Sequence, residues 1–71
     1  MCISKDGFDN SIWIFDYKPT KNEKARMFQT TDYSDNAIEL NCTDKELYAL
    51  FGIKDLTFEN SPIEIEIKVK Q

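Results

Sequence analysis

The sequence is rich in carboxylates and has two thiols, but it contains no histidine. Catalysis that uses histidine as general base, or beside a nucleophilic serine or cysteine, is therefore excluded, and the commonest zinc ligand is missing. Cys2 and Cys42 lie far apart in the sequence, so they form neither a C-x-x-C redox pair nor a four-thiolate zinc site.

Two short acidic runs place oxygen ligands close together. They are KDGFDN at residues 5–10 and DYSDN at residues 32–36. Neither has the alternating ligands and distant glutamate of an EF-hand calcium loop, whereas Asp and Asn are typical of turns, where they bond the nearby backbone. Gly7 and Gly52 stand alone and cannot build a phosphate-binding loop. We therefore expect turns at both runs, no catalytic residue, no metal and no cofactor.

The charge of the whole chain limits its partners. A formal net charge of −4 argues against sequence-independent binding to nucleic acid or to an anionic membrane surface. No apolar run approaches the roughly eighteen residues of a membrane span. With two cysteines and no apolar N-terminal run, we expect a cytoplasmic, reducing location.

One segment has the opposite charge. Residues 18–26, KPTKNEKAR, carry one acidic side chain against four basic ones, which are Lys18, Lys21, Lys24 and Arg26. Such a run is usually a solvated loop, and a functional basic patch is the alternative.

Two elements are clear from periodicity. Residues 63–70 alternate apolar and charged side chains, which predicts a half-buried antiparallel strand. Thr43 and Glu46 form a capping box before an apolar stripe, and Gly52 suits a left-handed helix end, so we expect a helix of about eight residues between them.

The segment between residues 18 and 42 fits two models. In the first, residues 20–24 are a hairpin loop followed by a strand at 25–33 and another at 37–42. In the second, residues 21–29 form a helix capped by Thr20 and Glu23. The hairpin is preferred because residues 21–29 supply a poor apolar stripe.

These elements predict one α+β domain over residues 1–71. We expect a small, mostly antiparallel sheet of four to five strands, in the order β-β-β-α-β-β, with one short helix packed on one face. Residues 1–10 are expected to be a flexible N-terminal segment. A chain of 71 residues has a thin core, so association with a partner would be a natural source of further stability.

The stretch SIWIFDY, residues 11–17, is apolar on both sides of a strand. If the helix covers Ile12 and Ile14, an aromatic row stays exposed, consisting of Trp13, Phe15 and Tyr17 with Phe28 and Tyr33 from the neighbouring strand. If the helix covers the aromatic side, the domain is nearly self-sufficient. An exposed row would be a contact surface.

The sequence thus favours a non-catalytic protein-binding domain, an accessory or inhibitory subunit that uses a sheet face or edge to bind another protein or a second copy as a homodimer. One alternative is binding of single-stranded nucleic acid by the aromatic row and the basic loop. A second is an acidic mimic that blocks a nucleic-acid-binding protein. The Lys- and Ile-rich composition hints at a bacterial or phage genome.

Overall fold

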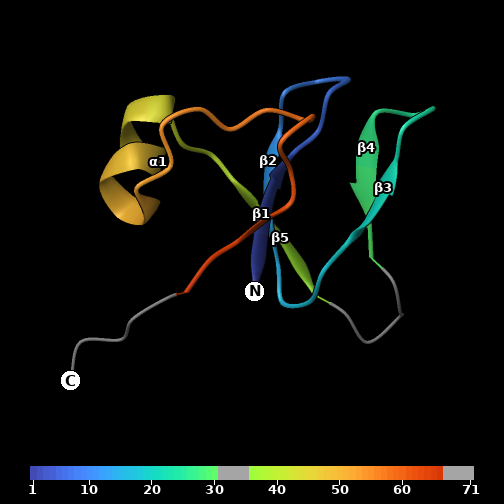
Figure 1. Ribbon diagram of the computed structural model, residues 1–71, viewed down its shortest axis with the longest axis horizontal. Coiled ribbons are helices and arrows are strands. Elements are labelled where there is room, and N and C mark those ends of the chain that lie inside the picture. The colour runs from blue at the N-terminus through green and yellow to red at the C-terminus, as the bar shows by residue number, and fades with distance from the viewer. Residues whose placement is uncertain (31–35, 67–71) are drawn as a thin grey trace.

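The computed structural model describes residues 1–30 and 36–66 and shows a four-stranded antiparallel sheet, a separate two-stranded hairpin and one helix (Figure 1). Along the chain these elements are β1 Cys2–Lys5, β2 Ile12–Phe15, β3 Thr20–Asn22, β4 Met27–Gln29, β5 Ala37–Leu40, α1 Asp44–Phe51 and β6 Ile63–Glu64. The expected α+β class with one short helix is confirmed. Within the described residues the strands divide between two sheets, and five of them precede the helix.

The larger sheet has the order β5-β2-β1-β6. Its register places Ile3 opposite Ile14 on one side and opposite Ile63 on the other. Residues that face each other in antiparallel strands point to the same side of the sheet. One face of the sheet is therefore lined by isoleucines.

The helix packs on this isoleucine face. Leu47 is 1% exposed and forms a core cluster with Ile3, Ile12 and Leu56. The helix begins as expected: the Thr43 hydroxyl accepts a hydrogen bond from the Glu46 backbone N–H at 3.2 Å, and the Glu46 carboxylate accepts one from the Thr43 N–H at 3.1 Å. Two backbone N–H groups that lack an intrahelical partner at the start of the helix are thereby satisfied.

The helix also ends where the sequence predicts. Gly52 has a φ of 72°, the left-handed conformation that glycine adopts without a steric penalty, and its N–H donates to the carbonyl of Tyr48 at 2.8 Å. The chain then turns back across the sheet and brings Leu56 into the helix-side core.

The β3–β4 hairpin covers the opposite face of the sheet. Phe15 from β2, Phe28 from β4 and Phe58 from the loop after the helix form a second core cluster, against which Trp13 and Ala37 pack. The rings of Phe28 and Phe58 lie 5.4 Å apart, centroid to centroid. Residues 21–29 form no helix, and β4 lies within the strand expected at 25–33. The hairpin preferred from the sequence is nevertheless wrong in its pairing, because residues 20–22, expected in its loop, form β3, and β4 pairs with β3 whereas β2 pairs with β1 and β5. The β3–β4 hairpin covers the aromatic side of β2 that the helix leaves open.

Residues 1–10 differ from the flexible segment that the sequence suggested. Within them β1 lies between β2 and β6, and Cys2, Ile3 and Ser4 are all buried. The strand has only four residues, and one of them is a serine whose hydroxyl has no hydrogen-bond partner in the described structure. A run this short and this polar does not show a readable two-residue period.

The last strand is shorter than its pattern. β6 spans Ile63–Glu64, and the Ile65 N–H adds one further hydrogen bond to the carbonyl of Met1 at 2.9 Å. Ile63 and Ile65 pack against the helix-side core, as the alternation predicts. Residues 67–70, the rest of the expected strand, lie outside the described residues.

Candidate binding surfaces

The five aromatic residues expected to form a contact row do not form one exposed surface. Phe15 and Phe28 are 3% and 5% exposed because the hairpin folds over them. Trp13 is half-buried, and its indole N–H donates to the Ser11 hydroxyl at 3.0 Å. Tyr17, beyond the end of β2, is 64% exposed, and Tyr33 lies outside the described residues.

Two of the four expected basic residues are held against the hairpin-side core. The Lys21 amino group lies 4.8 Å from the centre of the Phe58 ring, and the Arg26 guanidinium carbon lies 5.0 Å from it. Cations at this distance are attracted by the ring face. Lys18 and Lys24 are exposed, on the connection that follows β2 and in the hairpin turn.

The same two cations also contact Glu59. Lys21 donates to the Glu59 carbonyl at 3.3 Å, and Arg26 forms an ion pair with its carboxylate at 3.4 Å. The pKa of Glu59 is lowered, first by a hydrogen bond from its own backbone N–H and then by Arg26 and Lys21. The basic segment is thus partly used to fasten the hairpin to the loop after the helix.

The conformation of Arg26 is determined by several contacts. Its φ is 55°, which is uncommon for a residue with a side chain, and its carbonyl accepts hydrogen bonds from the N–H groups of Gly7 and Phe8 at 2.8 and 3.2 Å. A methyl group on Gly7 would come within 2.8 Å of the Arg26 Nε. Glycine at this position therefore leaves room for the guanidinium.

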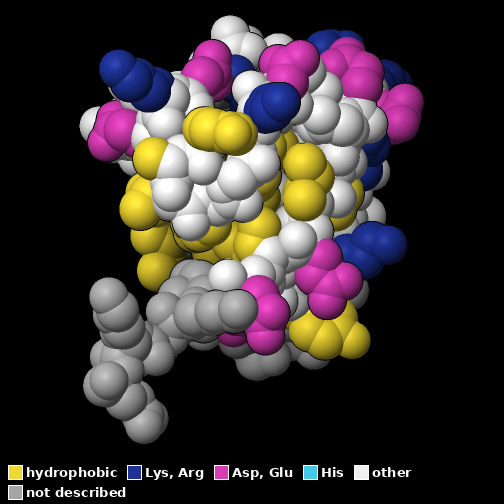
Figure 2. Space-filling view, turned by 60° about the vertical axis from the view of Figure 1, so that its left-hand side comes forward, with side chains coloured by type: hydrophobic (Ala, Val, Ile, Leu, Met, Phe, Trp, Pro, Cys, Tyr) yellow, Lys and Arg dark blue, Asp and Glu magenta, His cyan; other side chains and the backbone are white. Residues whose placement is uncertain are grey.

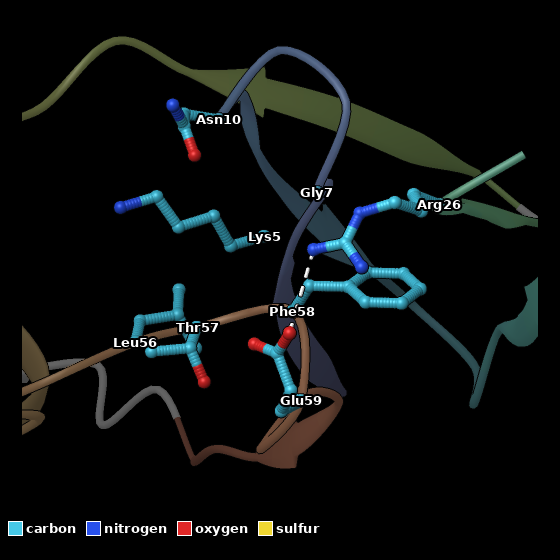
Figure 3. Close-up of a pocket in the computed structure, with 8 residues that line it drawn as sticks. All are labelled: Lys5, Gly7, Asn10, Arg26, Leu56, Thr57, Phe58 and Glu59. Atoms are coloured by element: carbon cyan, nitrogen blue, oxygen red, sulfur yellow. Dashed lines mark hydrogen bonds and ion pairs between the residues drawn. The ribbon is translucent and has the colours of Figure 1, made fainter. Parts of the chain in front are cut away.

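A polar pocket of about 200 Å³ opens beside this arginine (Figure 3). It is lined by Lys5, Gly7, Asn10, Arg26, Leu56, Thr57, Phe58 and Glu59. Figure 3 shows Lys5 extending away from Arg26, whose guanidinium turns toward Glu59. The pocket does not direct two cations at one point, so it lacks the geometry of an anion site.

The acidic and thiol groups do not assemble a reactive centre in the part of the chain that is described. No group of three or more Cys, Asp or Glu side chains there could hold a metal ion. Cys2 and Cys42 are both free thiols, and the pKa of Cys42 is raised by burial and by the nearby Glu46 and Asp44. A thiol with a raised pKa is a weaker nucleophile at neutral pH because less of it is thiolate.

Asp6 has a structural role. The residue is 4% exposed, and its carboxylate accepts hydrogen bonds from the Phe28 N–H at 2.9 Å and from the Ser11 hydroxyl at 3.4 Å. It thereby joins the turn after β1 to strand β4. Its pKa is raised because burial disfavours the charged form. The sequence run KDGFDN is a turn, as expected, whereas the buried contact to β4 had no signal in the sequence.

The two most exposed large hydrophobic side chains among the described residues lie on the helix side of the sheet. Ile38 on β5 is 65% exposed, and Leu50 on α1 is 69% exposed. Figure 2, which brings this side forward, shows hydrophobic side chains gathered in the left-hand and central part of the face. Leu40, Phe51 and Ile65 on the same side are partly buried against the core. We call these five residues, Ile38, Leu40, Leu50, Phe51 and Ile65, the helix-side surface.

Strand β5 also forms one edge of the sheet. The Asp16 N–H donates to the Asn36 carbonyl at 3.1 Å, and Asp16 continues the register of the β2–β5 pair. Hydrogen-bonded and non-hydrogen-bonded pairs alternate along antiparallel strands. Ile38 and Leu40 therefore direct their backbone groups to β2, while Ala37 and Glu39 direct theirs away from the sheet.

Comparison with protein-family models, with curated proteins and with solved structures gave no match for this chain. Among the described residues, no helix has the length and apolarity needed to cross a bilayer. What the protein binds must therefore be inferred from its own surfaces.

Proposed function

We propose that the protein is a non-catalytic binding module that docks another protein chain on the helix-side surface, with the edge of β5 at its centre. The main support is Ile38, a large apolar side chain that is 65% exposed on a strand with outward-facing backbone groups. Exposed apolar groups beside an open sheet edge are typical of contact sites. The proposal places the module in the cytoplasm, where free thiols such as Cys2 and Cys42 stay reduced.

The described structure favours this surface over the aromatic row considered first. Phe15 and Phe28 contribute to the core that holds the hairpin on the sheet. Exposing them would therefore lose roughly 1.5–3 kcal/mol of favourable burial free energy for each side chain. Ile38 and Leu50 require no such rearrangement because they are already exposed.

Binding of single-stranded nucleic acid gains no support from the site. Such binding needs accessible rings beside accessible cations. Lys21 and Arg26 are instead stacked on Phe58, which is itself buried.

A photo-crosslinking experiment tests the proposed function. A photoreactive amino acid at Asn41, which is exposed just after β5, should give a discrete covalent adduct in cells of the native host. Ile38→Lys should abolish the adduct, because a charge on the contact must be desolvated. Far-UV circular dichroism should be unchanged, because Ile38 is 65% exposed.

Two controls define the result. The same photoreactive group at Ala25, which is exposed in the hairpin turn, should give no such adduct. The substitution Gln29→Lys, at an exposed position on β4, should leave the Asn41 adduct intact. Adducts that form equally from Asn41 and Ala25, or that survive Ile38→Lys, would contradict docking on this surface.

A further inference from the structure

The outward backbone groups of β5 are its most specific feature. The N–H and C=O groups of Ala37 and Glu39 point away from β2, and the strand is the last in the order β5-β2-β1-β6. Within the described residues no backbone hydrogen bond joins them to another segment outside the sheet. Unpaired groups at a sheet edge are a template for a further strand.

We propose that the strand added at this edge is β5 of a second copy, in antiparallel orientation about a twofold axis. The proposal rests on the proposed function, since it names the chain that docks on the helix-side surface. Two identical edges can pair only in registers that bring outward-facing residues opposite each other. That condition leaves very few registers for a strand of four residues.

One register pairs all the outward-facing backbone groups of the strand. When Ile38 faces Ile38 of the second copy, Ala37 faces Glu39 in both directions, and these two pairs exchange their backbone hydrogen bonds. The two isoleucines then meet on the helix side, each covering the exposed side chain of the other. The joined sheets form one continuous antiparallel sheet.

The neighbouring registers are less favourable. If Glu39 instead of Ile38 lies at the twofold axis, Glu39 faces Glu39 of the second copy. Like charges directly opposite each other destabilise a strand pair. If Ala37 lies at the twofold axis, Ala37 faces Ala37, and Ile38 no longer faces Ile38 of the second copy. The sequence Ala37–Leu40, AIEL, therefore fits itself best with Ile38 at the centre.

The net charge of −4 on each copy makes a specific prediction about salt. Two negative chains repel, and dissolved ions screen that repulsion. Self-association should therefore strengthen as sodium chloride is raised. A partner attracted by opposite charge would instead be released by salt.

Sedimentation equilibrium of the full chain, combined with amide hydrogen exchange, tests this inference. We expect a monomer–dimer equilibrium that strengthens with salt, and slower exchange at Ala37 and Glu39 on dimer formation. The amides of Ile38 and Leu40, already bonded to β2, should change less. A dimer in which the amides of Ala37 and Glu39 exchange at the monomer rate would overturn the β5 pairing.

Two variants sharpen the experiment. Glu39→Pro removes an outward N–H and leaves the bonds of Ile38 and Leu40 to β2, and proline is accepted on edge strands; we expect at least a tenfold weaker dimer. Glu39→Gln, the matched control, keeps the N–H and should dimerise at least as well as the original chain. Equal dimerisation of the Pro and Gln variants would contradict the inference.

The outcomes for the two proposals are separable. A chain that stays monomeric at every concentration and salt, yet still gives the Ile38-dependent adduct from Asn41, would refute self-pairing and retain the binding module. Loss of the adduct as well would refute both. An adduct with twice the mass of the chain would support self-pairing directly.

Discussion

At the scale of single residues, Asp6 is the clearest case of a charge placed where it costs stability. Its raised pKa means that the folded state holds the proton more tightly than the unfolded state. The stability that this group contributes is therefore full below its ordinary pKa and is lost as pH rises through the raised pKa of the folded state. The hydrogen bond from the Phe28 N–H acts in the opposite direction, because it favours the ionised carboxylate and lowers the pKa of Asp6.

Asp6→Asn should change the pH dependence of stability. The amide oxygen can still accept the Phe28 N–H and cannot ionise, so the variant should gain stability relative to the original chain as pH rises from about 3 to 7. Urea unfolding at several pH values measures this difference. Asp9→Asn should show the opposite slope, because the pKa of Asp9 is lowered by its hydrogen bonds with Ser11. Parallel slopes for the two variants would contradict this account.

At the scale of elements, the sequence was most informative where local chemistry decides the structure. The helix could be predicted with both ends because Thr43, Glu46 and Gly52 act within a few residues of each other. A helix at residues 21–29 could be rejected from its missing apolar stripe, but the strand β3 at residues 20–22 and its pairing with β4 were not predicted. Strand β1 could not be predicted, because its burial depends on Ile14 and Ile63, which are distant in sequence.

The helix cap gives a prediction at this scale. Thr43→Ala removes the hydroxyl that accepts the Glu46 N–H, so the free energy of unfolding should fall by about 1 kcal/mol. Thr43→Ser keeps a hydroxyl in the same place and should recover most of the loss. Urea unfolding followed by circular dichroism measures both. A serine variant as unstable as the alanine variant would mean that the cap is not the cause.

The candidate site, too, could be predicted only where neighbouring residues determine the structure. The sequence identified β2 as apolar on both sides and predicted that the helix would cover one of them. The structure covers both, the isoleucine face by the helix-side core and the aromatic face by the hairpin-side core. The β3–β4 hairpin that covers the aromatic face was not predicted, because β3 lies in the expected loop and the position of the hairpin over Phe15 depends on distant contacts. No local pattern marked Ile38 as exposed, because its alternation with Glu39 is the same as that of a buried edge strand.

At the scale of the whole molecule, a short segment after the helix joins the two cores. Leu56 belongs to the helix-side cluster, and Phe58, two residues later, belongs to the hairpin-side cluster. Lys21 and Arg26 then fasten the hairpin to the same segment through Phe58 and Glu59. The two layers should therefore unfold together, although they cover opposite faces of the sheet.

Phe58→Ala tests this coupling. Truncating a buried phenylalanine typically removes about 3–5 kcal/mol, which is comparable to the roughly 3–5 kcal/mol that a core of this size supplies. The variant should be largely unfolded at 25 °C, with the helix and the Trp13 environment lost in one transition. Phe58→Leu should unfold in a single transition at lower urea concentration than the original chain. Circular dichroism and Trp13 fluorescence that change at different urea concentrations would show that the layers are independent.

The pairing of β1 with β6 has a consequence for how the chain folds as it is synthesised. Ile3 and Ile63 face each other although they lie sixty positions apart, so closing this contact carries the entropy of a long loop. On the ribosome, β1 leaves the exit tunnel before β6 and must wait for residue 63 to emerge. Until then one edge of β1 stays unpaired, and a nascent chain stalled before that point should be readily cut by protease or held by a chaperone.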